Sequence, residues 1–334
     1  MLKIAALVIL GCVSTAMANS YDPISENKGC IDVFYNNSQD LFMSSFDDSL
    51  KAQAHVKGIK VNSYNANKNA ELQFKQFLDA GADKCTKLVN LSDNFYSQPM
   101  ANTAIENNDT LIFFNNRPDA QAMIGNDRAW YVGSNPVEIG SSQGKMILDY
   151  LKNHKDYDRN NNGRVDILLF EGSFTDHATE FRTKKMIDEL RHNGVLYERV
   201  ATINAGWSFE KAFEFMQEFI SSHSLKDIDL IVSNNDAMAL GAIQSLQMHG
   251  YNLEHSSKNK IPVFGIDAIP EALFAIHRGF LAGTVSHDYR TIAKICIDIS
   301  QEKDIDILEL SKKYQFPIRD NYVMVPSNFT LSSK

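Results

Sequence analysis

Residues 158–170 read DRNNNGRVDILLF and begin like a calcium-binding loop of the EF-hand type. Such a loop places oxygen-bearing side chains at positions 1, 3, 5 and 9, a glycine at position 6 and a bidentate glutamate at position 12. The glycine is Gly163, but position 12 is Leu169, and the oxygen-bearing positions hold Asp158, Asn160, Asn162 and Asp166. Asn and Gly also gather in turns for local reasons. The loop therefore predicts either a calcium site that lacks one ligand or an Asn-rich turn.

Amides and carboxylates also stand directly after several short apolar runs. Ligands of open α/β sheets bind beyond the carboxyl ends of the strands, where such side chains would meet. The residues at these places are Asn36, Asn37, Asp40, Asn115, Asn116, Asn234, Asn235, Asp236, Asp267, His287 and Asp288. Any one of the Asn or Asp residues is equally suited to cap a helix. Their recurrence in both halves of the chain, with Phe42 and Trp207 nearby, predicts a polar pocket between two lobes.

The chemistry of that pocket suits an uncharged polyhydroxyl ligand. Asn, Asp and Arg offer the donors and acceptors that hydroxyl groups require, and Phe42 and Trp207 can stack on the two faces of a sugar ring. The chain has no Gly-rich phosphate loop and no hydrolase or metalloprotease motif. Asp236 and Asp267 could serve as glycosidase carboxylates, but nothing in the sequence fixes their separation. We therefore predict a binding protein rather than an enzyme.

Apolar runs alternate with amphipathic stretches along the whole chain, which predicts parallel, doubly wound sheets. Leu72, Phe77 and Leu78 are expected on the buried face of one helix, over 70–83 with its end at Gly81. The other helices are expected over 42–54, 98–108, 137–153, 178–193, 208–222, 236–248, 270–278 and 289–301. Strands are expected over 31–35, 59–64, 87–91, 110–114, 129–133, 165–170, 198–203, 229–234, 262–267 and 282–288. The pattern restarts at 129, so we predict two α/β units that share a C-terminal tail and several crossovers.

The N-terminus indicates export. Residues 1–18 hold one cation, Lys3, then an apolar run and an Ala-Met-Ala cleavage site, which together predict a removable signal peptide. The alternative is a lipoprotein modified at Cys12. No later apolar run reaches the ~18 residues that span a bilayer, so a soluble periplasmic protein is expected. The net charge of −8 argues against nucleic acid as a partner.

The remaining cysteines are Cys30, Cys85 and Cys296, an odd and sparse set that does not predict a disulfide scaffold. One interpretation is that all three are small buried apolar residues. The other is a single bridge between Cys30 and Cys85, which stand at the starts of two predicted strands.

Four blocks of the sequence resemble the periplasmic galactose- and glucose-binding proteins of ABC sugar importers. They are LIFFNNRP (111–118), WYVGSN (130–135), VSNNDAMALGAIQSL (232–246) and IPVFGIDAIPEALFAIHRGFLAGTV (261–285). The resemblance implies two Rossmann-like lobes, residues 19–133 plus 287–323 and residues 134–286 plus 324–334, joined by a three-segment hinge that closes on the sugar. It also implies a monomer that delivers its sugar to an inner-membrane permease and, in some species, signals to a chemoreceptor in chemotaxis. DNA-binding regulators of this fold carry an N-terminal helix-turn-helix, where this chain has its predicted signal peptide.

Most of the family's sugar ligands have a match in this chain. The matching residues are Asp40, Phe42, Asn115, Arg182, Trp207, Asn235 and Asp267. Three positions depart from the family: the loop before Arg182 reads Asp176-His177-Ala178 in place of His-Pro-Asp, and His287 replaces an asparagine. Asp176, His177 and His287 are thus candidate contacts of a different kind. The sugar is expected to be D-galactose, D-glucose or a related hexose, and the alternative is a binding protein of this fold for a pentose or an autoinducer-type sugar.

The resemblance also implies how the loop at 158–166 is completed. In the family the loop supplies calcium ligands at positions 1, 3, 5, 7 and 9, position 7 through its backbone oxygen, and a distant acidic residue closes the shell. Position 7 is Arg164, and the distant residue is Asp229, one methylene shorter than the family's glutamate. A structural Ca²⁺, far from the sugar, is therefore expected on Asp158, Asn160, Asn162, Arg164, Asp166 and Asp229.

Overall fold

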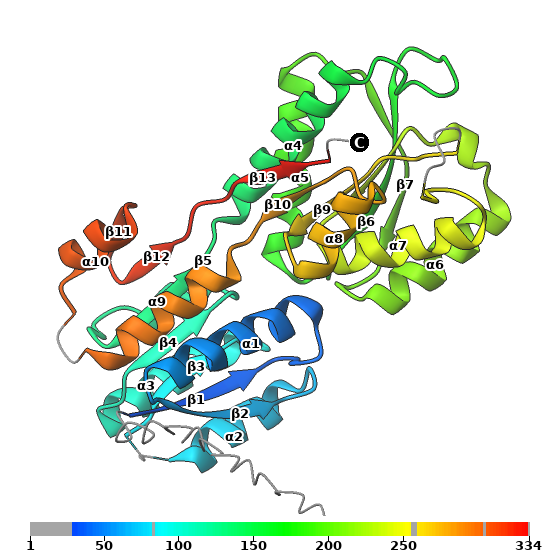
Figure 1. Ribbon diagram of the computed structural model, residues 1–334. Helices are drawn as coiled ribbons and strands as arrows, with labels where there is room; N and C mark the ends of the chain where they lie inside the picture. The colour runs from blue at the N-terminus through cyan, green and yellow to red at the C-terminus, as the bar shows by residue number, and fades with distance from the viewer. Residues whose placement is uncertain (1–28, 82–83, 255–258, 303–304, 333–334) are drawn as a thin grey trace, which may run out of the picture.

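The computed structural model describes residues 29–81, 84–254, 259–302 and 305–332. The predicted signal peptide, residues 1–18, and Cys12 lie outside the described residues. Two α/β lobes, each built on its own sheet, lie side by side (Figure 1). Among the described residues, no helix is long and apolar enough to cross a membrane.

The first lobe is built on a seven-stranded sheet of order β11-β12-β5-β4-β3-β1-β2. Strands β1 to β5 are parallel, and β12 joins β5 in the same direction, whereas β11 pairs with β12 antiparallel. The elements of its N-terminal part are β1 (Cys30–Tyr35), α1 (Leu41–Val56), β2 (Lys60–Asn65), α2 (Ala70–Ala80), β3 (Thr86–Val89), α3 (Ser97–Asn107), β4 (Leu111–Phe114) and β5 (Ala129–Gly133).

The second lobe is built on a six-stranded sheet of order β13-β10-β9-β8-β6-β7, in which only β13 is antiparallel. Its elements are α4 (Pro136–Asn153), β6 (Val165–Glu171), α5 (His177–His192), β7 (Tyr197–Asn204), α6 (Phe209–Ser222), β8 (Leu230–Ser233), α7 (Asp236–Met248), β9 (Val263–Asp267), α8 (Pro270–Arg278) and β10 (Gly283–Ser286).

The chain crosses between the lobes three times. It leaves the first lobe after β5, returns to it after β10, and leaves it again after β12. The C-terminal elements are α9 (Tyr289–Gln301), α10 (Ile307–Tyr314), β11 (Ile318–Arg319), β12 (Tyr322–Met324) and β13 (Phe329–Leu331). The predicted fold class, two Rossmann-like lobes joined by a three-segment hinge, is thereby confirmed.

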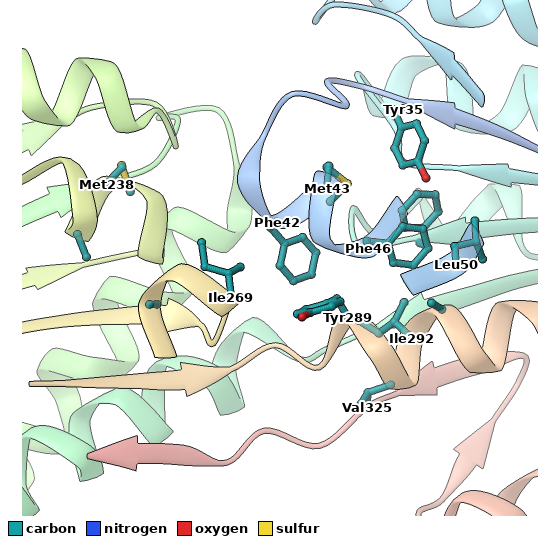
Figure 2. Close-up of a cluster of buried hydrophobic side chains, with 14 of the residues drawn as sticks. Tyr35, Phe42, Met43, Phe46, Leu50, Met238, Ile269, Tyr289, Ile292 and Val325 are labelled. Carbon is teal, nitrogen blue, oxygen red and sulfur yellow. The ribbon is translucent and has the colours of Figure 1, made fainter. Parts of the chain in front are cut away.

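The central strands of both sheets, such as β4 and β8, are buried along their whole length, which explains why they are apolar, whereas the edge strands β2 and β7 are partly exposed and more polar. Along β1, Val33 packs toward α1 and α9, whereas Phe34 packs toward α2 and α3. The cluster around α1 and α9 continues into the second lobe. There Phe42, Ile269 and Tyr289 lie close together where the lobes meet (Figure 2).

Two expectations about the first lobe need correction. Leu72 and Leu78 are 36% and 46% exposed, and the buried positions of α2 are Phe77 and Gln73. The three cysteines are not all unbonded, because Cys30 and Cys85 form a disulfide that joins the start of β1 to the residue before β3. Cys296 is buried in α9 with a free thiol.

Candidate functional site

Asp267 stands at the end of β9, in the interior of the second sheet. It is 5% exposed, and its Oδ1 lies 3.8 Å from Nη1 of Arg182 and 3.6 Å from Nδ1 of His287. Its φ of 123° is rare for a residue other than glycine. Backbone strain of this kind is concentrated at functional sites, where the surrounding structure holds it in place. The strain and the neighbouring guanidinium and imidazole both make Asp267 the centre of the candidate site.

Arg182 reaches this carboxylate from α5. Its Nη1 donates to the carbonyl oxygen of Asn234 at 2.7 Å, which fixes the guanidinium beside the end of β8. The same guanidinium lies over the ring of Trp207, 5.4 Å from its centroid. The buried Nε of Arg182 has no hydrogen-bond partner among the described residues.

Trp207 is held in a left-handed conformation, with a φ of 69°, in the loop before α6. Its carbonyl accepts a hydrogen bond of 3.2 Å from Nδ2 of Asn235, and its ring lies against Gly172. Oδ1 of Asn235 caps α7 by accepting from the backbone N–H of Met238 at 2.9 Å. Asn235 therefore serves as a helix cap and holds the tryptophan loop in this structure.

Asp40 belongs to the first lobe and caps α1. Its Oδ1 accepts from the backbone N–H groups of Phe42 and Met43 at 3.0 and 3.1 Å. Burial raises the pKa of Asp40 to about 6, against the opposing effect of these hydrogen bonds, and the negative charge of Asp267 raises it further. The two carboxylates, which belong to different lobes, are thus close enough for the charge of Asp267 to affect Asp40.

Phe42 lies at the boundary of the lobes, with Ile269 on one side and Tyr289 on another (Figure 2). The imidazole of His287 stacks on it, with ring centroids 4.4 Å apart and an interplanar angle of 19°. Tyr289 meets it edge-on at 6.1 Å. Phe42 is 6% exposed as a result. One face of the predicted sugar-stacking ring is therefore covered by another candidate site residue.

Asn115 follows β4 with a φ of 60°, and its Nδ2 donates to Oδ1 of Asn116 at 3.0 Å. Its carbonyl accepts a 2.9 Å hydrogen bond from the hydroxyl of Tyr131, a residue that the sequence analysis did not single out. Burial raises the pKa of this tyrosine, whereas the positive charges of Arg117 and Arg182 lower it. Tyr131 thus lies between the charges of the two arginines. The sequence feature connected with this position of Tyr131 is Gly133. A β-carbon at residue 133 would lie 2.3 Å from the Tyr131 hydroxyl, so the ring fits only beside a glycine.

The loop before α5 does not bring His177 into this group. Asp176 is the cap of α5 and accepts from the backbone N–H of Ala178 at 2.8 Å. His177 is exposed, and its ring lies 6.4 Å from that of Phe181 on its own helix. In this arrangement Asp176 has a structural role, and His177 faces solvent.

Asp236 lies at the start of α7 and is fully buried. Its carboxylate accepts from the hydroxyl of Thr284 at 2.7 Å and from the backbone N–H of Ile269 at 3.2 Å. Burial raises its pKa well above the usual range, and the charge of Asp267 adds to the effect. Asp236 thus joins the residues after β9 to β10 through these hydrogen bonds. Because its carboxylate is not accessible to solvent, it is not placed to act as a glycosidase carboxylate.

The loop at 158–166 is closed by its own hydrogen bonds. Asp229, at the start of β8 and fully buried, accepts from the backbone N–H groups of Arg159 at 2.7 Å and Asp166 at 2.8 Å. Asp166 accepts from Nε of Arg164 at 2.9 Å and from the amide groups of Asn160 at 2.8 Å and Asn162 at 2.6 Å. No group of three or more acidic, histidine or cysteine side chains that could hold a metal exists within the described parts of the chain. Amide and backbone oxygens would have to complete a metal shell here.

A groove with a volume of about 540 Å³ opens between α1, the start of α8 and the start of α9. Its walls come from both lobes, and Tyr289 and Arg290 form part of them. None of the predicted sugar contacts lines it, so it is separate from the group around Asp267.

Comparison with known proteins identifies the architecture. Residues 31–303 match the model of the periplasmic binding protein domain. The D-galactose/methyl-galactoside binding periplasmic protein MglB of Haemophilus influenzae is 30% identical over 299 residues, which cover 89% of this chain and 86% of that protein. A putative rhizopine-binding protein of Rhizobium meliloti is 27% identical over 65% of this chain and 64% of its own length.

Solved structures show the same fold. A periplasmic solute-binding protein from Actinobacillus succinogenes with bound D-allose has a TM-score of 0.73 at 18% identity, covering 91% of this chain and 98% of that one. The myo-inositol binding protein of Caulobacter has a TM-score of 0.70 at 19% identity, covering 92% and 94%. The chain therefore belongs to the periplasmic binding protein family.

Proposed function

We propose that this protein captures an uncharged monosaccharide between its lobes, with D-galactose or D-glucose as the expected hexose, and delivers it to an ABC importer. The observation that carries the proposal is the surroundings of Asp267. Arg182 of the second lobe and His287 of the hinge approach its carboxylate, and Asp40 of the first lobe is near enough for the charge of Asp267 to raise its pKa. A ligand that is enclosed when two lobes close needs hydrogen-bonding partners from both lobes.

Two aromatic rings, each with another side chain packed against one face, support a sugar as the ligand. Phe42 has His287 on one face, and Trp207 has Arg182 over its ring. The opposite faces are the ones proposed to stack on the apolar faces of a pyranose ring. Asn115, Asn235 and Asp40 supply further hydrogen-bonding groups of the kind that hydroxyls use.

The alternative is another sugar in the same cleft. Relatives include a xylitol-binding protein of Mycolicibacterium smegmatis and the D-xylose-binding periplasmic protein of Haemophilus influenzae, 24% and 27% identical to this chain. A binding site changes its preferred sugar when one buried hydrogen bond is lost, at a cost of ~1–3 kcal/mol. His287 and Asp176 are the positions at which we expect such a change.

We propose that the protein acts in the periplasm as a monomer, without catalytic activity. The disulfide between Cys30 and Cys85 supports an oxidising compartment. A chemoreceptor is a second proposed partner beside the permease.

Trp207 provides the test of ligand binding. We expect its fluorescence to change on titration with D-galactose or D-glucose, and Trp207→Phe to lose the signal while Trp130, buried in β5, is unaffected. Asp267→Ala should abolish binding, and Asp79→Ala, which removes an exposed carboxylate of α2, should not. If no hexose, pentose or cyclitol changes fluorescence or melting temperature, the proposal is wrong.

We also propose a structural calcium ion on Asp158, Asn160, Asn162, Arg164 (through its carbonyl), Asp166 and Asp229. The donors fit the metal, because calcium takes oxygen ligands from carboxylates, amides and carbonyls. Burial raises the pKa of Asp229, and the negative charges of Asp166 and Asp158 raise it further. A bound cation would relieve this repulsion, once the Asn160 and Asn162 amides turn their oxygens inward.

Calcium should therefore raise the melting temperature, and a chelator should lower it. A ligand at 100 times its Kd stabilises a protein by about 2.7 kcal/mol. Asp158→Asn should reduce the difference between the two conditions. Identical melting in calcium and in chelator, with no copurifying metal, would show that Arg164 and the two amides satisfy the loop without one.

A further inference from the structure

His287 occupies the second crossover between the lobes, directly after β10 and two residues before α9. Its side chain is 3% exposed, although the crossover itself lies at the boundary of the lobes. The backbone N–H of His287 faces the carbonyl of Asp267 at 3.4 Å, which holds the residue against the end of β9. The imidazole is thus fixed at the place where lobe motion must occur.

The imidazole contacts both lobes. Its ring stacks on Phe42 of the first lobe, and its Nδ1 lies 3.6 Å from Oδ1 of Asp267 in the second. Its other nitrogen, Nε2, is buried and has no hydrogen-bond partner among the described residues. Leaving a buried polar atom without a partner costs ~1–3 kcal/mol, so such an atom in a binding protein points to a missing ligand group.

We propose that His287 is a proton-linked specificity residue: its neutral imidazole binds a ligand hydroxyl through Nε2, and its protonation weakens ligand binding. This inference rests on the proposed function, because it assigns a role to one group of the same sugar site. With Nδ1–H directed at Asp267, Nε2 is an acceptor and requires a hydroxyl donor from the ligand. A sugar without a hydroxyl at that place would leave Nε2 unpaired.

The charges around the imidazole decide the sign of the pH effect. Burial lowers the pKa of His287 from 6.5, and the guanidinium of Arg182 lowers it further, against the opposing effects of Asp267 and Asp288. The charge of Asp267 also raises the pKa of Asp40, which caps α1, and of Asp236 at the start of α7, so these two carboxylates belong to the same electrostatic environment. Because the described packing favours the neutral imidazole, affinity should be full above pH 6.5 and should fall as the pH drops below it.

Asp40 also titrates in this range, since its pKa is raised to about 6. Its protonation removes an acceptor from the site, so it too weakens binding in acid. Each linked proton contributes up to one unit of slope to a plot of log Kd against pH. The wild type should therefore lose affinity more steeply than a variant without His287.

The experiment measures Kd by calorimetry between about pH 7.5 and pH 5 for the best-binding sugar of the panel. Protonation of His287 should raise Kd by up to tenfold for each pH unit below the pKa of its imidazole in the unliganded protein. His287→Asn should remove this part and keep the weaker dependence from Asp40. His177→Asn, which changes an exposed histidine of the same lobe, should behave as the wild type does.

The outcomes separate the two proposals. If the wild type binds no sugar at any pH, the proposed function is wrong. If the wild type and His287→Asn bind with the same pH slope, only the inference about His287 is overturned. If the variant does not fold, the imidazole Hε1 signal of wild-type His287 is followed by NMR. It should titrate without sugar and stop titrating with saturating sugar, and a titration that sugar leaves unchanged would overturn the inference.

Discussion

The substitution Gly172→Ala, which adds one methyl group next to the Trp207 ring, should weaken ligand binding. Gly172 directly follows β6, and a β-carbon built there lies 2.2 Å from Cε2 and Cζ2 of the Trp207 ring. Gly172→Ala therefore forces the ring out of its present position by on the order of 1 Å, which should disturb its proposed stacking on the sugar. The backbone of Gly172 is not in the left-handed region, so the substitution acts through the ring and not through backbone strain.

The size of the effect follows from the overlap. Overpacking of this kind costs ~1–3 kcal/mol. If the cost falls on the liganded state, the affinity drops by roughly 5- to 150-fold. Calorimetry with the best-binding sugar measures the affinity, and the emission maximum of Trp207 reports the ring's surroundings in the absence of ligand.

A double-mutant cycle isolates the mechanism. In a Trp207→Ala background the new methyl group of Gly172→Ala has no ring to meet, so it should change the affinity no further. Wild-type affinity and an unchanged emission maximum in Gly172→Ala would refute the proposed position of the ring.

Further predictions concern stability and ligand charge. Removing the disulfide by Cys30→Ser with Cys85→Ser releases a loop of sequence separation 55, which should lower the free energy of unfolding by about 4 kcal/mol. Urea unfolding with and without reductant checks this, and equal midpoints would contradict it. Because Asp40 and Asp267 both carry negative charge at neutral pH and would repel a ligand carboxylate, uronic acids should bind at least about ten times more weakly than the matching hexoses. Competition titration with galacturonate measures this, and equal affinity would show that the carboxylates are neutralised.

Much of the fold could be predicted from the sequence because the central strands are buried on both faces and therefore form short apolar runs. The run at 129–133 and the helices at 236–248, 270–278 and 289–301 have the predicted bounds. Periodicity fails on α2, where Gln73 is buried in preference to Leu72 and Leu78. Gln73 donates to the carbonyls of Phe34 and Asn90 and accepts from Ser92, so hydrogen bonds to distant strands decide which face is buried.

The candidate site was predictable only where residue type and strand end coincide. Asp267 ends an apolar strand in the sequence, and the structure places Arg182 and His287 beside it. The stacking of His287 on Phe42 was not predictable, because it joins a residue of α1 to a residue of the second crossover, far apart in the sequence. The role of Asp176 also depended on local geometry, since a carboxylate before a helix serves equally well as a cap or as a ligand.

The role of Asp267 exceeds that of one hydrogen-bonding group. Its carboxylate positions both side chains that back the aromatic rings, His287 behind Phe42 and Arg182 over Trp207. Loss of this charge would leave the His287 imidazole without its neighbouring carboxylate in a buried place, where unpaired polar groups are costly, whereas Arg182 would keep its hydrogen bond to the carbonyl of Asn234. The support of Phe42 would therefore weaken more than that of Trp207. The proposed contact of Asp267 with the sugar and its contact with His287 depend on the same carboxylate, so their energies cannot add independently.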